Sequence, residues 1–157
     1  DEIFSKLRYM IVGCECDWVV VDHLHMLVNQ LTESDERRGI DTLMNRLRSL
    51  VEETGVGMFL VSHLRRASGD RGHEQGIEVS LSHLKGSQGI SQLSDCVIAL
   101  ERNQQAEDET ESNTTKVRVL KSRYTGDTGL ACSLLYDVET GRMNEVTDQV
   151  TLDDLPF

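Results

Sequence analysis

Two polar residues follow apolar runs at positions where their side chains could meet a nucleotide. Asp22 closes the β-branched run 18–21, and His63 closes the run 56–62. If these runs are neighbouring parallel strands, their carboxyl ends share the sheet edge where ligands bind in open α/β folds. There a carboxylate can hold a magnesium ion that bridges nucleotide phosphates, and an imidazole can contact a γ-phosphate. An alternative stays open for each residue alone, because both types can also simply cap a strand or turn.

A K-x-R pair offers a second possible phosphate contact. Lys121 and Arg123 follow the apolar run 117–120 and precede the segment 124–129, which contains two glycines. Arginine can bind phosphate oxygens through two nitrogens at once, and lysine adds a point charge. The pair could also be ordinary solvated side chains near a strand end. The sequence contains no G-x-x-x-x-G-K-[ST] motif, so the chain cannot cradle a triphosphate by itself.

A long loop without hydrophobic periodicity follows His63 and extends to about Val79. Residues 65–71 carry three arginines and one aspartate, whereas 107–111 and 137–154 are strongly acidic. Loops of this length are uncommon inside compact domains and are usually functional or mobile. The formal net charge of −11 argues against nucleic acid when taken alone. A basic loop on an acidic body can nevertheless contact a phosphate backbone locally.

The elements that would position these residues are those of an α/β fold. Apolar residues at helical spacing lie between the first two runs, which gives the strand–helix–strand order of a parallel βαβ unit: Ile40, Leu43, Leu47, Leu50 and Val51. Further helices are expected over 2–12 and 90–93. The later part predicts a β meander added to the parallel sheet, with strands at 96–100, 117–120, 132–136 and 142–146.

Composition describes an ordinary globular protein. The 157 residues are 38% hydrophobic and 27% charged, which suits one domain or a large piece of one. No apolar run approaches the roughly 20 residues of a membrane helix, so we expect no membrane association. The four cysteines show no disulfide or zinc spacing and indicate thiols in a reducing compartment. The first residue is Asp and no signal peptide is visible, so the chain looks like a fragment.

Several short segments also follow one another in a specific order. They are 18–24, Ser62-His63, 84–87, 92–95, 99–103, 120–123 and 125–129. Together they resemble the replicative hexameric DNA helicases, with the phage primase-helicase and mitochondrial Twinkle branch closest and DnaB more distant. The resemblance implies that residues 1–146 are the C-terminal portion of a RecA-like P-loop NTPase motor and that 147–157 are an acidic tail.

The resemblance assigns the nucleotide chemistry to particular residues. It implies that Asp22 is the Walker B aspartate on magnesium, that His63 senses the γ-phosphate, and that Gln92 couples nucleotide state to the DNA loops. Arg123, with Lys121 beside it, would be the arginine finger inserted into the neighbouring subunit's site. The base would lie between Arg102 and Tyr136, a sound arrangement because a cation is attracted to a π-face. The substrate would be ATP or another NTP or dNTP.

The resemblance also implies partners. Single-stranded DNA would pass through the channel of a hexamer-type ring and contact Arg65, Arg66, Arg71, Lys85 and Gly86. The acidic tail, ending in Phe157, would dock on the replicative polymerase, although a solvated, disordered end is an equally good explanation. The expected compartment is the cytoplasm of a bacterium or phage-infected cell rather than the mitochondrial matrix.

The implied activity is unwinding of duplex DNA at the replication fork. The phosphate-binding loop and the glutamate that polarises the attacking water are expected upstream of Asp1, so this piece alone should be inert. Two alternatives remain. One is a RecA-like recombinase that coats DNA without unwinding it, and the other is a non-catalytic α/β interaction module. The second gives no purpose to the basic loop.

Overall fold

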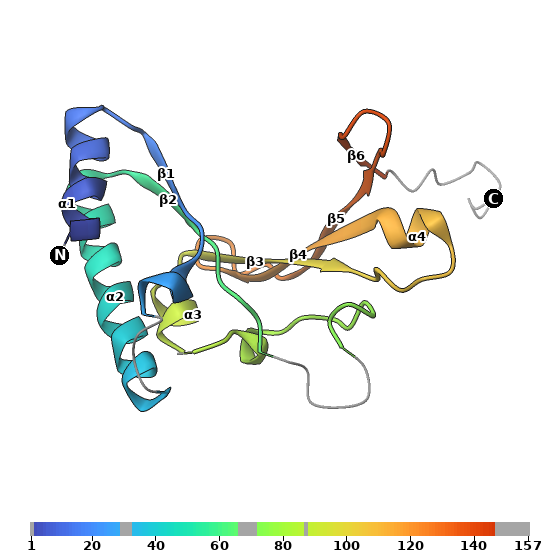
Figure 1. Cartoon of the computed structure of the whole chain (residues 1–157), viewed down its shortest axis with the longest axis horizontal. Helices are drawn as coiled ribbons and strands as arrows, with labels where there is room; N and C mark the ends of the chain where they lie inside the picture. The colour runs from blue at the N-terminus through green and yellow to red at the C-terminus, as the bar shows by residue number, and fades with distance from the viewer. Residues whose placement is uncertain (1, 29–32, 66–71, 87, 147–157) are drawn as a thin grey trace. The chain divides into compact units, whose positions relative to one another are not determined.

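The chain forms two compact units in the computed structural model (Figure 1). The structure describes residues 2–28, 33–65, 72–86 and 88–146. The first unit consists of Asp1–Arg65 and Leu81–Ser94, and the second consists of Arg66–Ser80 and Asp95–Phe157.

The first unit carries the long helix α2 and the parallel strands. In chain order its elements are α1 (Glu2–Arg8), a π-helical turn (Tyr9–Gly13), β1 (Trp18–Val21), a 3-10 turn η2 (Leu24–Leu27), α2 (Glu33–Thr54), β2 (Gly57–Leu60), a 3-10 turn η3 (Leu81–His83) and α3 (Gly89–Leu93). The helix expected over 2–12 is thus α-helical only to Arg8, and the π turn after it closes with the Cys14 N–H on the Tyr9 carbonyl at 3.0 Å.

Helix α2 is long because its apolar residues recur on one face and a glycine stands just beyond its end. Ile40, Leu47 and Leu50 are each at most 2% exposed. Gly55 follows with φ +73°, the left-handed conformation that commonly ends helices, and its N–H bonds the Val51 carbonyl. The apolar face of α2 packs with Leu7, Val19 and other residues into one core cluster.

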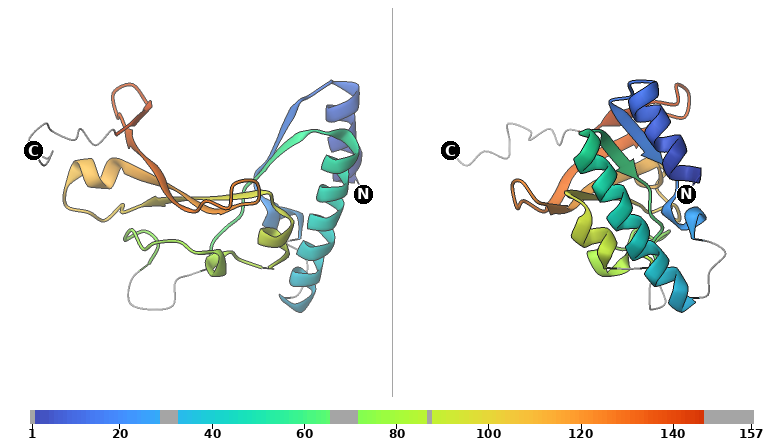
Figure 2. Two further views of the ribbon diagram at one scale, coloured as in Figure 1. Left: turned by 180° about the vertical axis from the view of Figure 1, so that it is seen from behind. Right: turned by 90° about the vertical axis from the view of Figure 1, so that its left-hand side faces the viewer.

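Strands β1 and β2 are parallel neighbours, as the sequence predicts. Their register pairs Trp18 with Gly57 and Val21 with Leu60. Helices α1 and α2 lie on one side of this pair (Figures 1 and 2), where Val19 is 2% exposed. On the other face Trp18 is 66% exposed and stacks on Phe59, with ring centroids 5.4 Å apart.

The second unit is an antiparallel meander. Its sheet has the order β3-β4-β5-β6, formed by β3 (Cys96–Arg102), β4 (Thr114–Ser122), β5 (Gly129–Tyr136) and β6 (Met143–Glu145), with a short helix α4 (Glu109–Asn113) before β4. The four predicted strands are confirmed. The expectation that they extend the parallel sheet is wrong, because the described strands form two separate hydrogen-bonded sheets, β1-β2 and β3-β4-β5-β6.

An ion pair joins β3 and β4 of the meander. The Glu101 side chain is 4% exposed, and its Oε1 accepts hydrogen bonds from Arg118 Nε and the Val79 N–H, both at 2.8 Å. Glu78 adds a second carboxylate 3.2 Å from Arg118. The hydrogen bond to Glu101 is the main reason that the pKa of Arg118 is raised. The second unit therefore places a charged contact where a core would usually be apolar.

No helix among the described residues is long and apolar enough to cross a membrane. All four cysteines are free.

Candidate functional site

The edge of the first unit's sheet gathers residues from both strand ends. Asp22 follows β1 directly and is exposed, and its peptide bond to His23 is cis. The chain stays paired just beyond the strands, because the Leu24 N–H bonds the Val61 carbonyl at 3.0 Å. The His23 ring meets the His63 ring edge-on with centroids 4.0 Å apart. The structure thus brings the ends that carry Asp22 and His63 to one edge, as the parallel arrangement requires.

The segment with Lys85 is attached to this edge through the backbone. Lys85 N donates to the His63 carbonyl at 3.0 Å, and Arg65 N donates to the His83 carbonyl at 2.7 Å. Between these two bonds Leu64 and Leu84 form an antiparallel bridge. Two predicted site residues, His63 and Lys85, are therefore held by one short ladder.

His25 is buried behind this edge and supports it, and the sequence carries little sign of it. It is 2% exposed, and its Nε2 lies 3.0 Å from the Lys85 carbonyl oxygen. Since a carbonyl only accepts, Nε2 carries the proton and donates. Burial is the main reason that the pKa of His25 lies below its ordinary value, which favours a neutral ring. The only signal in the sequence is the D-H-x-H spacing after β1.

Gly86 and Arg65 complete the described part of the predicted DNA segment. Gly86 has φ +103°, and a Cβ there would stand 2.3 Å from Ile40 Cδ1, so glycine is required. Arg65 Nη2 donates to the Gly86 carbonyl at 3.3 Å. The Lys85 ammonium is 3.7 Å from Glu36 and its side chain is 48% exposed. Arg66 and Arg71 lie outside the described residues, as does Phe157.

Gln92 stands on α3, and its side chain is exposed in the first unit. Its backbone N–H bonds the Gln88 carbonyl at 3.0 Å. The coupling role assigned to it stays a prediction.

In the second unit, Arg123 is anchored just past β4. Its N–H bonds the Asp95 carbonyl at 2.8 Å, and its Nη1 bonds the Asp95 carboxylate at 2.9 Å. The Arg123 side chain is still 51% exposed. Lys121 lies two residues earlier, opposite Val97 on β3. Asp95 therefore orients an arginine whose side chain remains accessible.

Arg102 and Tyr136 lie at the opposite end of the meander from Arg123. Arg102 is opposite Thr115, and Tyr136 lies two residues past Leu134, which is also opposite Thr115. The guanidinium of Arg102 donates to the carbonyl of Ser112 and to the Asn113 side chain, at 2.5 and 3.0 Å. The strands bring Arg102 and Tyr136 to one end of the sheet, while the guanidinium of Arg102 is hydrogen-bonded to the end of α4.

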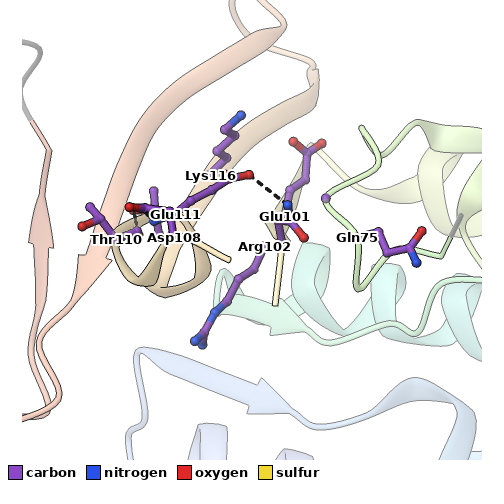
Figure 3. Close-up of a pocket in the computed structure, with 10 residues that line it drawn as sticks. Gln75, Glu101, Arg102, Asp108, Thr110, Glu111 and Lys116 are labelled. Atoms are coloured by element: carbon purple, nitrogen blue, oxygen red, sulfur yellow. Dashed lines mark hydrogen bonds between the residues drawn. The ribbon is translucent and has the colours of Figure 1, made fainter. Parts of the chain in front are cut away.

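An open pocket of about 390 Å³ lies beside Arg102. In Figure 3 Arg102 and Lys116 extend in different directions from neighbouring strands, with Asp108, Thr110 and Glu111 on one side and Gln75 on the other. Asp108 caps α4 by accepting the Glu111 N–H at 2.7 Å. The pocket thus combines cations and carboxylates next to the residue predicted to hold a base.

Asp22 suits a magnesium ion that is shared with a nucleotide. Magnesium in nucleotide sites is held by one or two carboxylates, with phosphates and water supplying the other ligands. A single exposed carboxylate at a strand end meets that need. Within the described residues, no group of three His, Cys, Asp or Glu side chains could form an all-protein metal site.

These features define a class of protein. A parallel pair with polar residues at its carboxyl edge, flanked by helices and followed by a meander, is the C-terminal half of a RecA-like P-loop NTPase core. A KaiC-like protein of Pyrococcus horikoshii has a similar fold, with a TM-score of 0.61 at 15% identity, over 94% of this chain and 56% of that one.

The chain belongs to the DnaB-like helicase C-terminal domain family, whose model matches residues 1–145. A DNA helicase/primase of Enterobacteria phage T3 is 45% identical to it over 141 residues. That match covers 90% of this chain but 24% of the phage protein, so the chain spans about a quarter of that relative's length.

Proposed function

We propose that this chain is the C-terminal half of the motor of a ring-forming, NTP-driven replicative DNA helicase that moves on single-stranded DNA. Membership of the DnaB-like family and the similarity to a phage helicase/primase support this proposal. The intact site would form between subunits of a hexamer-type ring. Each subunit would supply its own strand edge and send Arg123 to a neighbour.

One observation carries the proposal. The residue expected to sense the γ-phosphate and the segment expected to contact DNA are joined by backbone hydrogen bonds, His63 to Lys85 and Arg65 to His83. A short ladder of this kind moves as a unit, because shifting one strand breaks the bonds that hold the other. Nucleotide state at the strand edge can therefore change the position of the DNA segment.

The residues divide the nucleotide chemistry among them. Asp22 would hold magnesium, which when bound neutralises phosphate charge as the terminal phosphoryl group is transferred to water. His63 would donate a hydrogen bond to that phosphoryl group. Arg123, oriented by Asp95, would place its guanidinium on the same group in the neighbouring subunit, where charge develops in the transition state.

DNA would be held through its phosphates. Arg65 and Lys85 are exposed on the described part of the ladder, and Arg66 and Arg71 continue the same basic loop in sequence. Contacts of this type are independent of base sequence and weaken as salt rises. A helicase requires such contacts because it must move along any sequence.

The test is hydrolysis of ATP and other nucleotides by the full natural chain, with and without single-stranded DNA. We expect DNA to stimulate the wild type, and we expect Arg123→Ala to lower the rate at least about 10³-fold, as loss of an arginine finger does. His63→Ala should abolish the response to DNA. Arg142→Ala, an exposed arginine of the same unit as Arg123, is the matched control and should behave as wild type. Normal turnover by Arg123→Ala would show that the finger assignment is wrong.

Mixing variants separates action within one subunit from action between subunits. Inactive Arg123→Ala subunits mixed with inactive Asp22→Asn subunits should regain part of the activity if the finger acts on a neighbour. Electron microscopy of the wild type with nucleotide and DNA should reveal closed rings. Filaments in place of rings would favour a DNA-coating recombinase instead.

A further inference from the structure

We infer that His25 is a positioning residue that links the nucleotide end of β1 to the Lys85–Gly86 segment, so that DNA contact at Lys85 reaches the nucleotide site. This inference rests on the proposed function, since it assigns a task within a DNA-stimulated motor. It concerns a buried residue, 2% exposed, to which the proposed function gives no contact with phosphate.

The backbone of Lys85 is held from both sides by histidines of the two strand ends. Its N–H donates to the His63 carbonyl at 3.0 Å, and its carbonyl oxygen lies 3.0 Å from His25 Nε2. His63 comes from the segment after β2, and His25 comes from the turn after β1. One residue of the predicted DNA segment is therefore fixed by both strands whose ends form the nucleotide edge.

The surroundings of His25 favour a specific donor over a space-filling side chain. The ring is 2% exposed, and its Nδ1 is buried without a hydrogen-bond partner among the described residues. A buried polar ring is costly unless its hydrogen bond is made. The ring also lies near His63, with centroids 5.6 Å apart. His25 thus contacts the DNA segment through Nε2 and approaches the γ-phosphate sensor through its ring.

The Lys85–Gly86 segment can hardly move unless His25 moves with it. At Gly86 the space beside Cα is closed, with Ile40 Cδ1 at 2.3 Å and His25 Nε2 at 3.7 Å from a Cβ position. Arg65 Nη2 holds the Gly86 carbonyl at 3.3 Å. A shift of Lys85 when DNA binds must therefore either carry the His25 ring with it or break the hydrogen bond. Both outcomes change what lies beside His63.

Two substitutions distinguish the hydrogen bond that His25 donates from the space that its ring fills. His25→Gln keeps an N–H that can reach the Lys85 carbonyl, whereas His25→Leu fills the space and leaves that carbonyl unpaired. Both are made in the full natural chain, and Met26→Leu serves as the control because Met26 lies in the same turn and is 63% exposed. Nucleotide hydrolysis is measured with and without single-stranded DNA, alongside the salt dependence of DNA binding.

We expect His25→Leu to reduce the stimulation by DNA about tenfold, the effect of leaving one buried acceptor unpaired. Its rate without DNA should stay within about twofold of wild type, a small difference on the scale of an activation barrier. His25→Gln should retain at least half of the stimulation, and Met26→Leu should retain all of it. A residue that only packs would give the reverse order, because leucine suits an apolar pocket better than glutamine.

Several outcomes would overturn the inference. They are full stimulation in His25→Leu, equal losses in both His25 variants, a parallel change in the rate without DNA, and failure of both variants to fold. A wild-type chain that DNA does not stimulate would instead refute the proposed function, and this inference with it. Stimulated wild type with unaffected His25 variants would remove the inference alone.

Discussion

The two units are held together by different means. Every residue of the main apolar core cluster belongs to the first unit, on α1, β1, α2 and the segments packed against them. In the second unit the described buried apolar residues are Val79 and Ala99, whereas Glu101 is a buried carboxylate paired with Arg118. The first unit relies on apolar burial, and the second relies on its strand ladder and on charged contacts.

This difference in packing suits the tasks proposed for the two units. The strand edge with His25, His63 and Lys85 stands on a packed core, which fixes backbone positions closely. Arg123 instead stands past the end of a strand, held by Asp95 at the surface. A residue that must reach another subunit benefits from such accessibility, while a sensor benefits from a rigid support.

If apolar burial stabilises the first unit, a cavity in its core should destabilise the protein strongly. Leu47→Ala removes a side chain that is 2% exposed and should lower the free energy of unfolding by about 2–5 kcal/mol. Asn45→Ala, on the exposed face of the same helix, should change it by less than about 0.5 kcal/mol. Denaturant unfolding of the natural chain measures both, and equal effects would contradict the apolar core.

Two glycines test how closely each unit packs around its loops. Gly86→Ala forces both a left-handed alanine and a contact with Ile40, and should cost about 2–4 kcal/mol. Gly126→Ala, in the second unit, meets no atom within 4 Å and should cost only about 1 kcal/mol, from its φ of +76°. Thermal unfolding gives the two values, and a larger loss at Gly126 would reverse the comparison.

The ion pair tests whether charge stabilises the second unit. Glu101→Ala leaves the buried Val79 N–H without its acceptor and should cost about 1–3 kcal/mol. Glu78→Ala removes the other carboxylate of Arg118, which is 71% exposed, and should have little effect. Amide exchange at Val79 reports the first change directly. Unchanged protection there would indicate that Glu101 is dispensable.

Acidification should affect the two units in different pH ranges. Burial lowers the pKa of His25 in the folded chain, so on acidification this residue takes up its proton at a higher pH in the unfolded chain than in the folded chain. The stability of the first unit therefore falls as pH drops below about 6.5. The pKa of Asp137 is lowered by hydrogen bonds from Thr140 and Glu139, so its turn loses support only below about 3.9. NMR amide spectra can follow both losses of stability as pH falls. His25→Gln should remove the loss below about pH 6.5 and leave the loss at lower pH unchanged.

Local patterns in the sequence were enough to predict the strands. The run 18–21 coincides with β1, and the parallel pairing placed Asp22 and His63 at one edge. The helical periodicity found α2, although the helix extends further at its polar start, where no apolar pattern marks it. These features depend on neighbours in sequence, which periodicity describes well.

Contacts between distant residues were beyond such patterns. The bond from His25 to Lys85 spans 60 positions, and a histidine four residues after a strand carries no sign of its partner. Helix α4 lies in an acidic stretch without apolar periodicity, and only its Asp108 cap could have signalled it. The separation of the two sheets depends on which strand edges pair, which composition does not encode.

Trp18 is the only tryptophan of the chain, and its side chain on β1 is 66% exposed and stacks on Phe59. An indole in water emits at longer wavelength than one in an apolar setting. Because parallel strands are normally covered on both faces, any layer that closes over β1 and β2 would bury this ring. The intrinsic fluorescence of the protein is therefore a built-in signal for that event, with a blue shift expected when the face is covered and no label required.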